Sequence, residues 1–121
     1  MSRAGFLAVA ALALPLYAAG DPPAKTTSTP PQFVGRWTVT FANGVVETCD
    51  VKADWTTSES EPKRSADGKA EVKDNALVIT FADDRVERWT VVDKRMVVEH
   101  FFPGAEYPAG SRVLGIADRA P

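Results

Sequence analysis

The sequence predicts an all-β protein, a small antiparallel up-and-down meander of seven or eight short strands that closes into a barrel. Apolar and polar residues alternate through much of the chain after residue 35, as expected for half-buried strands. Turn residues such as Asn43-Gly44 recur between these segments, which is typical of hairpins that follow one another. No segment has an apolar stripe at helical spacing, so we expect little or no helix.

The expected strands are short and follow one another along the chain. We place them at residues 36–41, 45–52, 69–73, 76–82, 85–92, 95–102 and 112–117. Residues 58–61 are a weak strand at best, because they have almost no apolar side chains. Turns are expected at residues 43–44, 67–68, 74–75, 83–84 and 93–94, and residues 103–111 form a loop with two prolines and two glycines.

The chain begins with the pattern of a secretory signal peptide. Arg3 precedes an apolar stretch, and small residues at Ala18 and Gly20 fit a cleavage site after Gly20. The stretch is shorter than the roughly 20 residues that a spanning helix needs, and Pro15 interrupts it. We therefore predict a signal peptide at residues 1–20, a secreted or periplasmic protein, and no membrane span after cleavage.

One domain follows a linker. Residues 21–32 contain four prolines and no large apolar side chain, which is typical of a disordered Pro/Thr-rich linker, and residues 33–121 form the barrel domain. The net charge is −2 and the charges are interleaved, so we expect no nucleic-acid partner. A single cysteine, Cys49, cannot form an internal disulfide. We favour a buried thiol over a bond to a second chain, and we expect a monomer.

Two hairpins resemble each other at an offset of 40 residues. The matching segments are 39–42 with 79–82 and 46–47 with 86–87. The same offset pairs Cys49 with Trp89, which favours a structural place in the core for both residues.

Strand register decides which side chains face inward, because a shift by one residue reverses the face. In the second hairpin, a three-residue loop that pairs Ile79 with Trp89 collects the large apolar side chains on one face. A two-residue loop would put Trp89 on the other face and leave it exposed, which is unfavourable for so large a side chain. The same argument pairs Val39 with Cys49 in the first hairpin.

The next turn extends this inner face. A two-residue turn at residues 93–94 pairs Glu87 with His100, and on the outer face it sets Arg88 opposite Glu99 as a weak ion pair. The predicted inner face comprises Trp37, Val39, Phe41, Cys49, Val51, Leu77, Ile79, Phe81, Trp89, Val91, Met96 and Val98.

Glu47, Glu87 and His100, the only histidine, are expected at one end of that face. Two inward carboxylates and a histidine could bind a cation or a polar ligand, and a Glu–His pair could serve acid–base chemistry. The alternative is that they are rim residues at an open end, satisfied by water or by one another. We treat them as binding candidates. We assign no catalytic residue, metal ligand or cofactor, because the sequence lacks a nucleophile elbow, His-rich metal spacing and a phosphate loop.

Two aromatic side chains are further binding candidates. Trp55 stands where a turn is expected, and it either anchors a partner or covers a barrel end. Tyr107 lies in the loop at 103–111, which could be a rigid binding loop or a long closure.

Residues 33–39, Phe-Val-Gly-Arg-Trp-Thr-Val, resemble the Gly-x-Trp start of the first strand in lipocalin-like barrels. The resemblance implies that Gly35 and Trp37 are structural and that Trp37 closes one barrel end. It also implies that an arginine from a late strand, Arg112 or Arg119, packs over Trp37. The layout of signal, linker, Gly-x-Trp and short meander also resembles uncharacterised secreted paralogue families of planctomycete bacteria, which implies no activity.

From these features we expect an exported binding or interaction module with an unknown protein or small-molecule ligand. The alternative, implied by the resemblance, is a lipocalin-like carrier of a small hydrophobic ligand inside the barrel. An enzyme is the third possibility. An apolar internal cavity would favour the carrier, whereas an interior filled with side chains would favour the interaction module.

Overall fold

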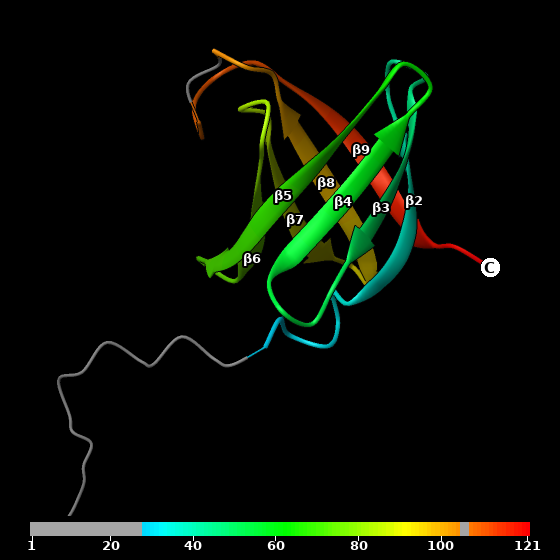
Figure 1. Cartoon of the computed structure of the whole chain (residues 1–121), viewed down its shortest axis with the longest axis vertical. Coiled ribbons are helices and arrows are strands. Elements are labelled where there is room, and N and C mark those ends of the chain that lie inside the picture. The colour runs from blue at the N-terminus through cyan, green and yellow to red at the C-terminus, as the bar shows by residue number, and fades with distance from the viewer. Residues whose placement is uncertain (1–27, 105–106) are drawn as a thin grey trace, which may run out of the picture.

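The protein is a closed antiparallel barrel of eight strands, as the sequence predicts (Figure 1). The computed structural model describes residues 28–104 and 107–121. Each strand pairs with the next in the chain, and the last pairs with the first. The strands are β2 (Gly35–Phe41), β3 (Val46–Val51), β4 (Thr56–Glu61), β5 (Arg64–Lys73), β6 (Ala76–Phe81), β7 (Val86–Val92), β8 (Arg95–Phe101) and β9 (Arg112–Arg119).

The β2–β3 and β6–β7 hairpins share one loop geometry. The Phe41 amide donates to the Val45 carbonyl at 2.9 Å, and the Phe81 amide donates to the Arg85 carbonyl at the same distance. Each loop thus holds three residues and ends in a left-handed one, Gly44 with φ 89° or Asp84 with φ 70°, as in a turn followed by a bulge.

The predicted register of these two hairpins was wrong by two residues. Ile79 pairs with Glu87 and Leu77 with Trp89, and Val39 pairs with Glu47. The predicted pairs would need two more residues in each loop than the loop holds. Because side chains alternate with period two, the shift leaves every side chain on the face that was predicted.

The β7–β8 hairpin has the predicted register. Asp93 and Lys94 both have left-handed backbone angles, which suit a two-residue turn, and Glu87 pairs with His100. Arg88 and Glu99 lie opposite each other on the outer face, with Nη1 and Oε1 2.8 Å apart.

The structure corrects the sequence prediction for β4 and β5. Residues 58–61 belong to a full strand of six residues, and residues 67–68, predicted as a turn, lie inside the ten-residue strand β5. Gly68 is an interior glycine because a Cβ there would lie 2.9 Å from the Phe81 ring. The sequence signal for β4 is weak because its inward side chains, Thr57 and Glu59, are polar and yet buried.

Aromatic and branched side chains fill the barrel interior. The Trp37 and Trp89 rings meet edge to face with centroids 5.7 Å apart. Cys49 is fully buried and free. All the predicted inner residues are buried except Val91, which is 50% exposed. Val91 lies two residues after Trp89, and the pairing of β7 with β6 ends at Leu77–Trp89.

The two similar hairpins also pack alike. The Phe41 ring lies over Gly115 of β9, where an added Cβ would come within 2.7 Å of it, and the Phe81 ring lies over Gly68 of β5 in the same way. The repeat at an offset of 40 residues therefore corresponds to two hairpins with equivalent neighbours in space.

One end of the barrel, which we call the tryptophan end, is covered by the N-terminal segment and the last strand. The Trp37 indole donates to the Phe33 carbonyl at 2.9 Å, and the Arg119 guanidinium stacks 4.2 Å from the Trp37 ring. The resemblance implied that either Arg112 or Arg119 packs over Trp37. Arg119 does so, because it pairs with Trp37 in the β2–β9 register. Arg112 lies at the opposite end of β9 and pairs with Glu99.

Described residues that precede Phe33 also contact the barrel. Thr29 is buried, and its hydroxyl donates to the Lys52 carbonyl at 2.6 Å. The predicted signal peptide and residues 21–27 of the predicted linker lie outside the described residues. No helix among the described residues is long and apolar enough to span a membrane.

Candidate functional site

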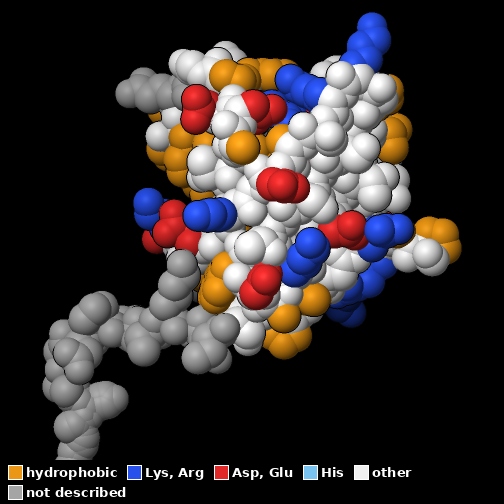
Figure 2. All heavy atoms as spheres, viewed as in Figure 1, with side chains coloured by type: hydrophobic (Ala, Val, Ile, Leu, Met, Phe, Trp, Pro, Cys, Tyr) orange, Lys and Arg blue, Asp and Glu red, His pale blue; other side chains and the backbone are white. Residues whose placement is uncertain are grey.

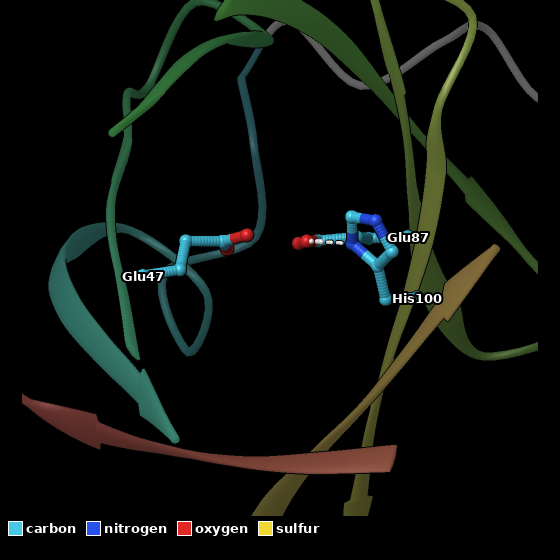
Figure 3. A group of neighbouring side chains, drawn as sticks. All are labelled: Glu47, Glu87 and His100. Atoms are coloured by element: carbon cyan, nitrogen blue, oxygen red, sulfur yellow. Dashed lines mark hydrogen bonds and ion pairs between the residues drawn. The ribbon is translucent and has the colours of Figure 1, made fainter. Parts of the chain in front are cut away.

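Glu47, Glu87 and His100 lie together inside the end of the barrel opposite the tryptophan end, which we call the polar end. Glu47 comes from β3, and Glu87 and His100 come from the paired strands β7 and β8. Their carboxylate and imidazole groups point toward one another across the interior (Figure 3). One donor atom from each residue lies within 4.8 Å of the others.

These three residues are buried and do not form an exposed rim. Glu47 and Glu87 have no exposed surface, and His100 is 4% exposed. The idea of solvated rim residues is therefore wrong. Each residue lies one position from the end of its strand, but the rings of Phe41 and Phe102 lie 5.4 and 5.1 Å from the His100 ring and shield it.

Glu87 is held by two neighbours. Its Oε2 lies 2.8 Å from His100 Nδ1, and its Oε1 accepts a hydrogen bond of 3.0 Å from the Trp89 indole. Both carboxylate oxygens thus have a partner, and the side chain is fixed in direction. The Trp89 contact joins the site to the apolar core.

Glu47 has no such support. Neither of its carboxylate oxygens, nor His100 Nε2, has a hydrogen-bond partner among the described residues. Burial, repulsion from the Glu87 carboxylate and the close approach of the two carboxyl groups together raise the pKa of Glu47 to about 12. A buried polar group without a partner is destabilising, so Glu47 is the least satisfied side chain in this site.

A buried ion-pair network adjoins the site and was missed by the sequence analysis. The Arg85 side chain is fully buried, and its guanidinium contacts Glu59 at 2.6 Å, Glu61 at 2.6 Å and Asp83 at 2.7 Å. Burial raises the pKa of Glu59 although Arg85 opposes that effect. Burial acts to lower the pKa of Arg85, but the Glu59 and Asp83 hydrogen bonds raise it above its usual value.

A signal for this network was present in the sequence. Glu59 and Glu61 alternate with Thr57 on one face of β4, and Arg85 has the same inward phase as Glu87 and Trp89. The weak apolar content of residues 58–61 hid it. An inward acidic strand requires a buried cation, and Arg85 supplies it.

The inward groups of the polar end have more acidic than basic members. Glu47, Glu59, Glu61 and Glu87 face one another around Arg85 and His100. Arg85 contacts Glu59 and Glu61, and His100 contacts Glu87, so Glu47 is the carboxylate without a contact to an arginine or histidine side chain among the described residues.

A small cavity lies beside His100 at this end. Its volume is about 50 Å³, and its lining includes Phe41, Glu61, Arg64, His100 and Phe102. A cavity of this size holds only a few water molecules. It therefore has room for water or an ion, and no room for an organic ligand without movement of the barrel.

The other predicted binding residues lie elsewhere. Trp55 is half-buried and packs against the core near the tryptophan end, with its amide donating to the buried Thr29 hydroxyl at 3.1 Å. Tyr107 packs edge to face on Phe101 at 5.0 Å. Neither residue joins the group at Glu47. On the face shown in Figure 2, acidic and basic side chains are interspersed, without a field of one sign.

Comparisons with protein-family models, with curated proteins and with solved structures give no match. The closed antiparallel barrel of eight strands is compatible with a lipocalin-like fold.

Proposed function

We propose that this chain is an exported binding module, secreted or periplasmic, that holds a small polar or charged ligand inside the polar end of its barrel. One observation supports this function above all. Glu47 is fully buried with both carboxylate oxygens unpartnered among the described residues, and it faces Glu87 and His100. A ligand that binds there would satisfy groups whose burial is otherwise unfavourable.

The alternative, a carrier of a hydrophobic ligand, has less support. Such a carrier needs an apolar internal cavity, whereas the interior here is occupied by side chains such as Trp37, Phe81 and Trp89. A larger hollow of about 650 Å³ is lined mainly by outward-facing groups such as Arg36, Thr48 and Ser58. A polar ligand at the polar end therefore fits the arrangement better.

Native mass spectrometry of the protein purified from the exported fraction tests the proposal. We expect the wild-type chain and the exposed control variant Glu71→Gln to retain the same bound species, and Glu47→Gln to lose it. A chain without any bound species, or one that keeps it in Glu47→Gln, would overturn the proposal. Binding of a fluorescent fatty acid by the wild-type chain would instead support the carrier.

A further inference from the structure

We propose that the ligand of the polar end is a divalent metal ion of the zinc class, held by Glu47, Glu87 and His100. This inference rests on the proposed function and names the ligand for it. The three side chains come from separate strands of a closed barrel, so the fold itself places the donors.

The donor atoms match zinc chemistry. A carboxylate oxygen from each glutamate and one imidazole nitrogen lie within 4.8 Å of one another. Zinc bonds to such donors are about 2.0–2.1 Å long, so the three side chains must adjust for all three donors to bind one ion. Three protein ligands and one open position are the usual set for a zinc ion that also binds water.

The neighbours of the ligands suit this role. Trp89 Nε1 donates to Glu87 Oε1 at 3.0 Å and fixes the direction of the carboxylate. Phe41 and Phe102 each contact the imidazole ring edge to face. Groups that orient metal ligands in this way raise the affinity of a site. The cavity of about 50 Å³ is lined by His100 but not by the two glutamates, so it has room for water beside one of the three ligands.

The proposed ion lies between His100 Nδ1 and Glu87 Oε2, which are 2.8 Å apart in the structure. In Figure 3 this nitrogen contacts the Glu87 carboxylate, and the Glu47 carboxylate points toward Glu87 from the opposite wall. The ion takes the place of the proton in that contact, and Glu47 gives up any proton it carries, because metal ligands bind in their deprotonated form. Two negative carboxylates then surround a doubly positive ion, and Glu47 gains the cationic neighbour that it otherwise lacks.

A second group, Glu47 with Glu59 and Glu61, also has oxygens within 4.8 Å of one another, but it is the weaker candidate. Glu59 and Glu61 each contact Arg85 at 2.6 Å, so a cation there competes with a fixed guanidinium. Calcium takes six to eight oxygen ligands, which the group at Glu47, Glu87 and His100 does not offer. Its imidazole instead favours zinc and neighbouring transition metals.

Metal binding to the full chain, stripped of metal with a chelator, tests the inference. Zinc chloride is titrated against a chromophoric competitor, and cobalt(II) is added as a spectroscopic probe. We expect one equivalent of zinc to bind, and Glu47→Gln and His100→Gln to weaken binding by roughly tenfold or more. The exposed control Glu71→Gln should leave the affinity unchanged. The cobalt spectrum should lack a thiolate charge-transfer band, because Cys49 is not among the ligands.

Each variant is first checked for folding by circular dichroism. If His100→Gln does not fold, Glu47→Gln gives the result alone, since its neutral amide has nearly the shape of the glutamate and removes only the ligand charge.

Unchanged zinc affinity in the folded variants, or a cobalt–thiolate band, would overturn the assigned ligands. If the chain binds no zinc or cobalt but retains another species that depends on Glu47, the metal proposal fails and the proposed function stands. If the chain binds neither metal nor any other species, both fail.

Discussion

Inside the barrel, the Arg85 guanidinium is surrounded by carboxylates rather than water. It contacts Glu59, Glu61 and Asp83, and its side chain is fully buried. A buried charge is tolerated when its partners satisfy it, but removing one partner leaves the other buried without compensation. This residue should therefore be far more sensitive to substitution than the surface arginines.

We predict that Arg85→Met lowers the free energy of unfolding by about 3–5 kcal/mol, because it leaves the buried Glu59 carboxylate without its cation. Glu61 keeps its contact of 3.3 Å with Arg64. Urea denaturation followed by tryptophan fluorescence measures the change. The matched control is Arg88→Met, which removes the partly exposed pair with Glu99 and should cost no more than about 1 kcal/mol. Equal costs for the two variants would show that the Arg85 network does not stabilise the barrel.

At the level of strands and turns, the hairpins were the most predictable part of the fold. Asn43-Gly44 marks a turn because glycine adopts the left-handed angle found there, and the two-residue turn at 93–94 set the register of β7 and β8. The loops before β3 and β7 were located correctly and have the predicted three residues. The residue pairs assigned to those loops were wrong, which shifted both registers by two residues.

Strand β4 was the least predictable element, for a physical reason. Its inward Glu59 is stabilised by a neighbour distant in sequence, Arg85, which lies 26 residues further along the chain. Hydrophobic alternation cannot detect a strand whose buried face is polar. The three candidate residues Glu47, Glu87 and His100 could be placed on one face from side-chain alternation and from the hairpin turns. Their full burial could not, since it depends on how the strands and the Phe102 ring enclose the polar end.

We predict that Gly115→Ala, in β9, lowers the free energy of unfolding by about 1–3 kcal/mol through overpacking. The new Cβ would lie 2.7 Å from Phe41 Cδ1 and 3.1 Å from the Thr40 carbonyl. Thermal unfolding measures the cost. Phe41→Leu in the same chain should recover part of it, because the two positions are in contact. Additive effects of the two substitutions would contradict the contact.

For the molecule as a whole, the first and last strands decide whether the barrel closes. Strand β2 pairs with β9 from Trp37–Arg119 to Phe41–Gly115. The Arg119 side chain also donates to the Val34 carbonyl at 2.6 Å, and it crosses Gly35 to do so. The absence of a side chain at residue 35 is therefore part of the closure.

We predict that Gly35→Ala destabilises the barrel by about 1–3 kcal/mol. Gly35 has φ 140°, and a Cβ there would lie 2.5 Å from Arg119 Nη1. Gly44→Ala separates the two causes, because Gly44 also has a positive φ but has nothing within 4 Å of an added Cβ. Urea denaturation should show that Gly35→Ala lowers the free energy of unfolding more than Gly44→Ala does. A loss no larger than that of Gly44→Ala would mean that the Arg119 contact does not contribute.

The pairing of β9 with β2 also bears on how the folded chain behaves at high concentration. An open sheet presents unpaired amide and carbonyl groups along its outer strands, and these groups template the addition of strands from other molecules. In this barrel every strand has two neighbours, so no such edge is available. Self-association through strand addition therefore requires the β2–β9 seam to separate first, and the contacts of Arg119 and Trp37 that hold one end of this seam protect the folded protein from aggregation.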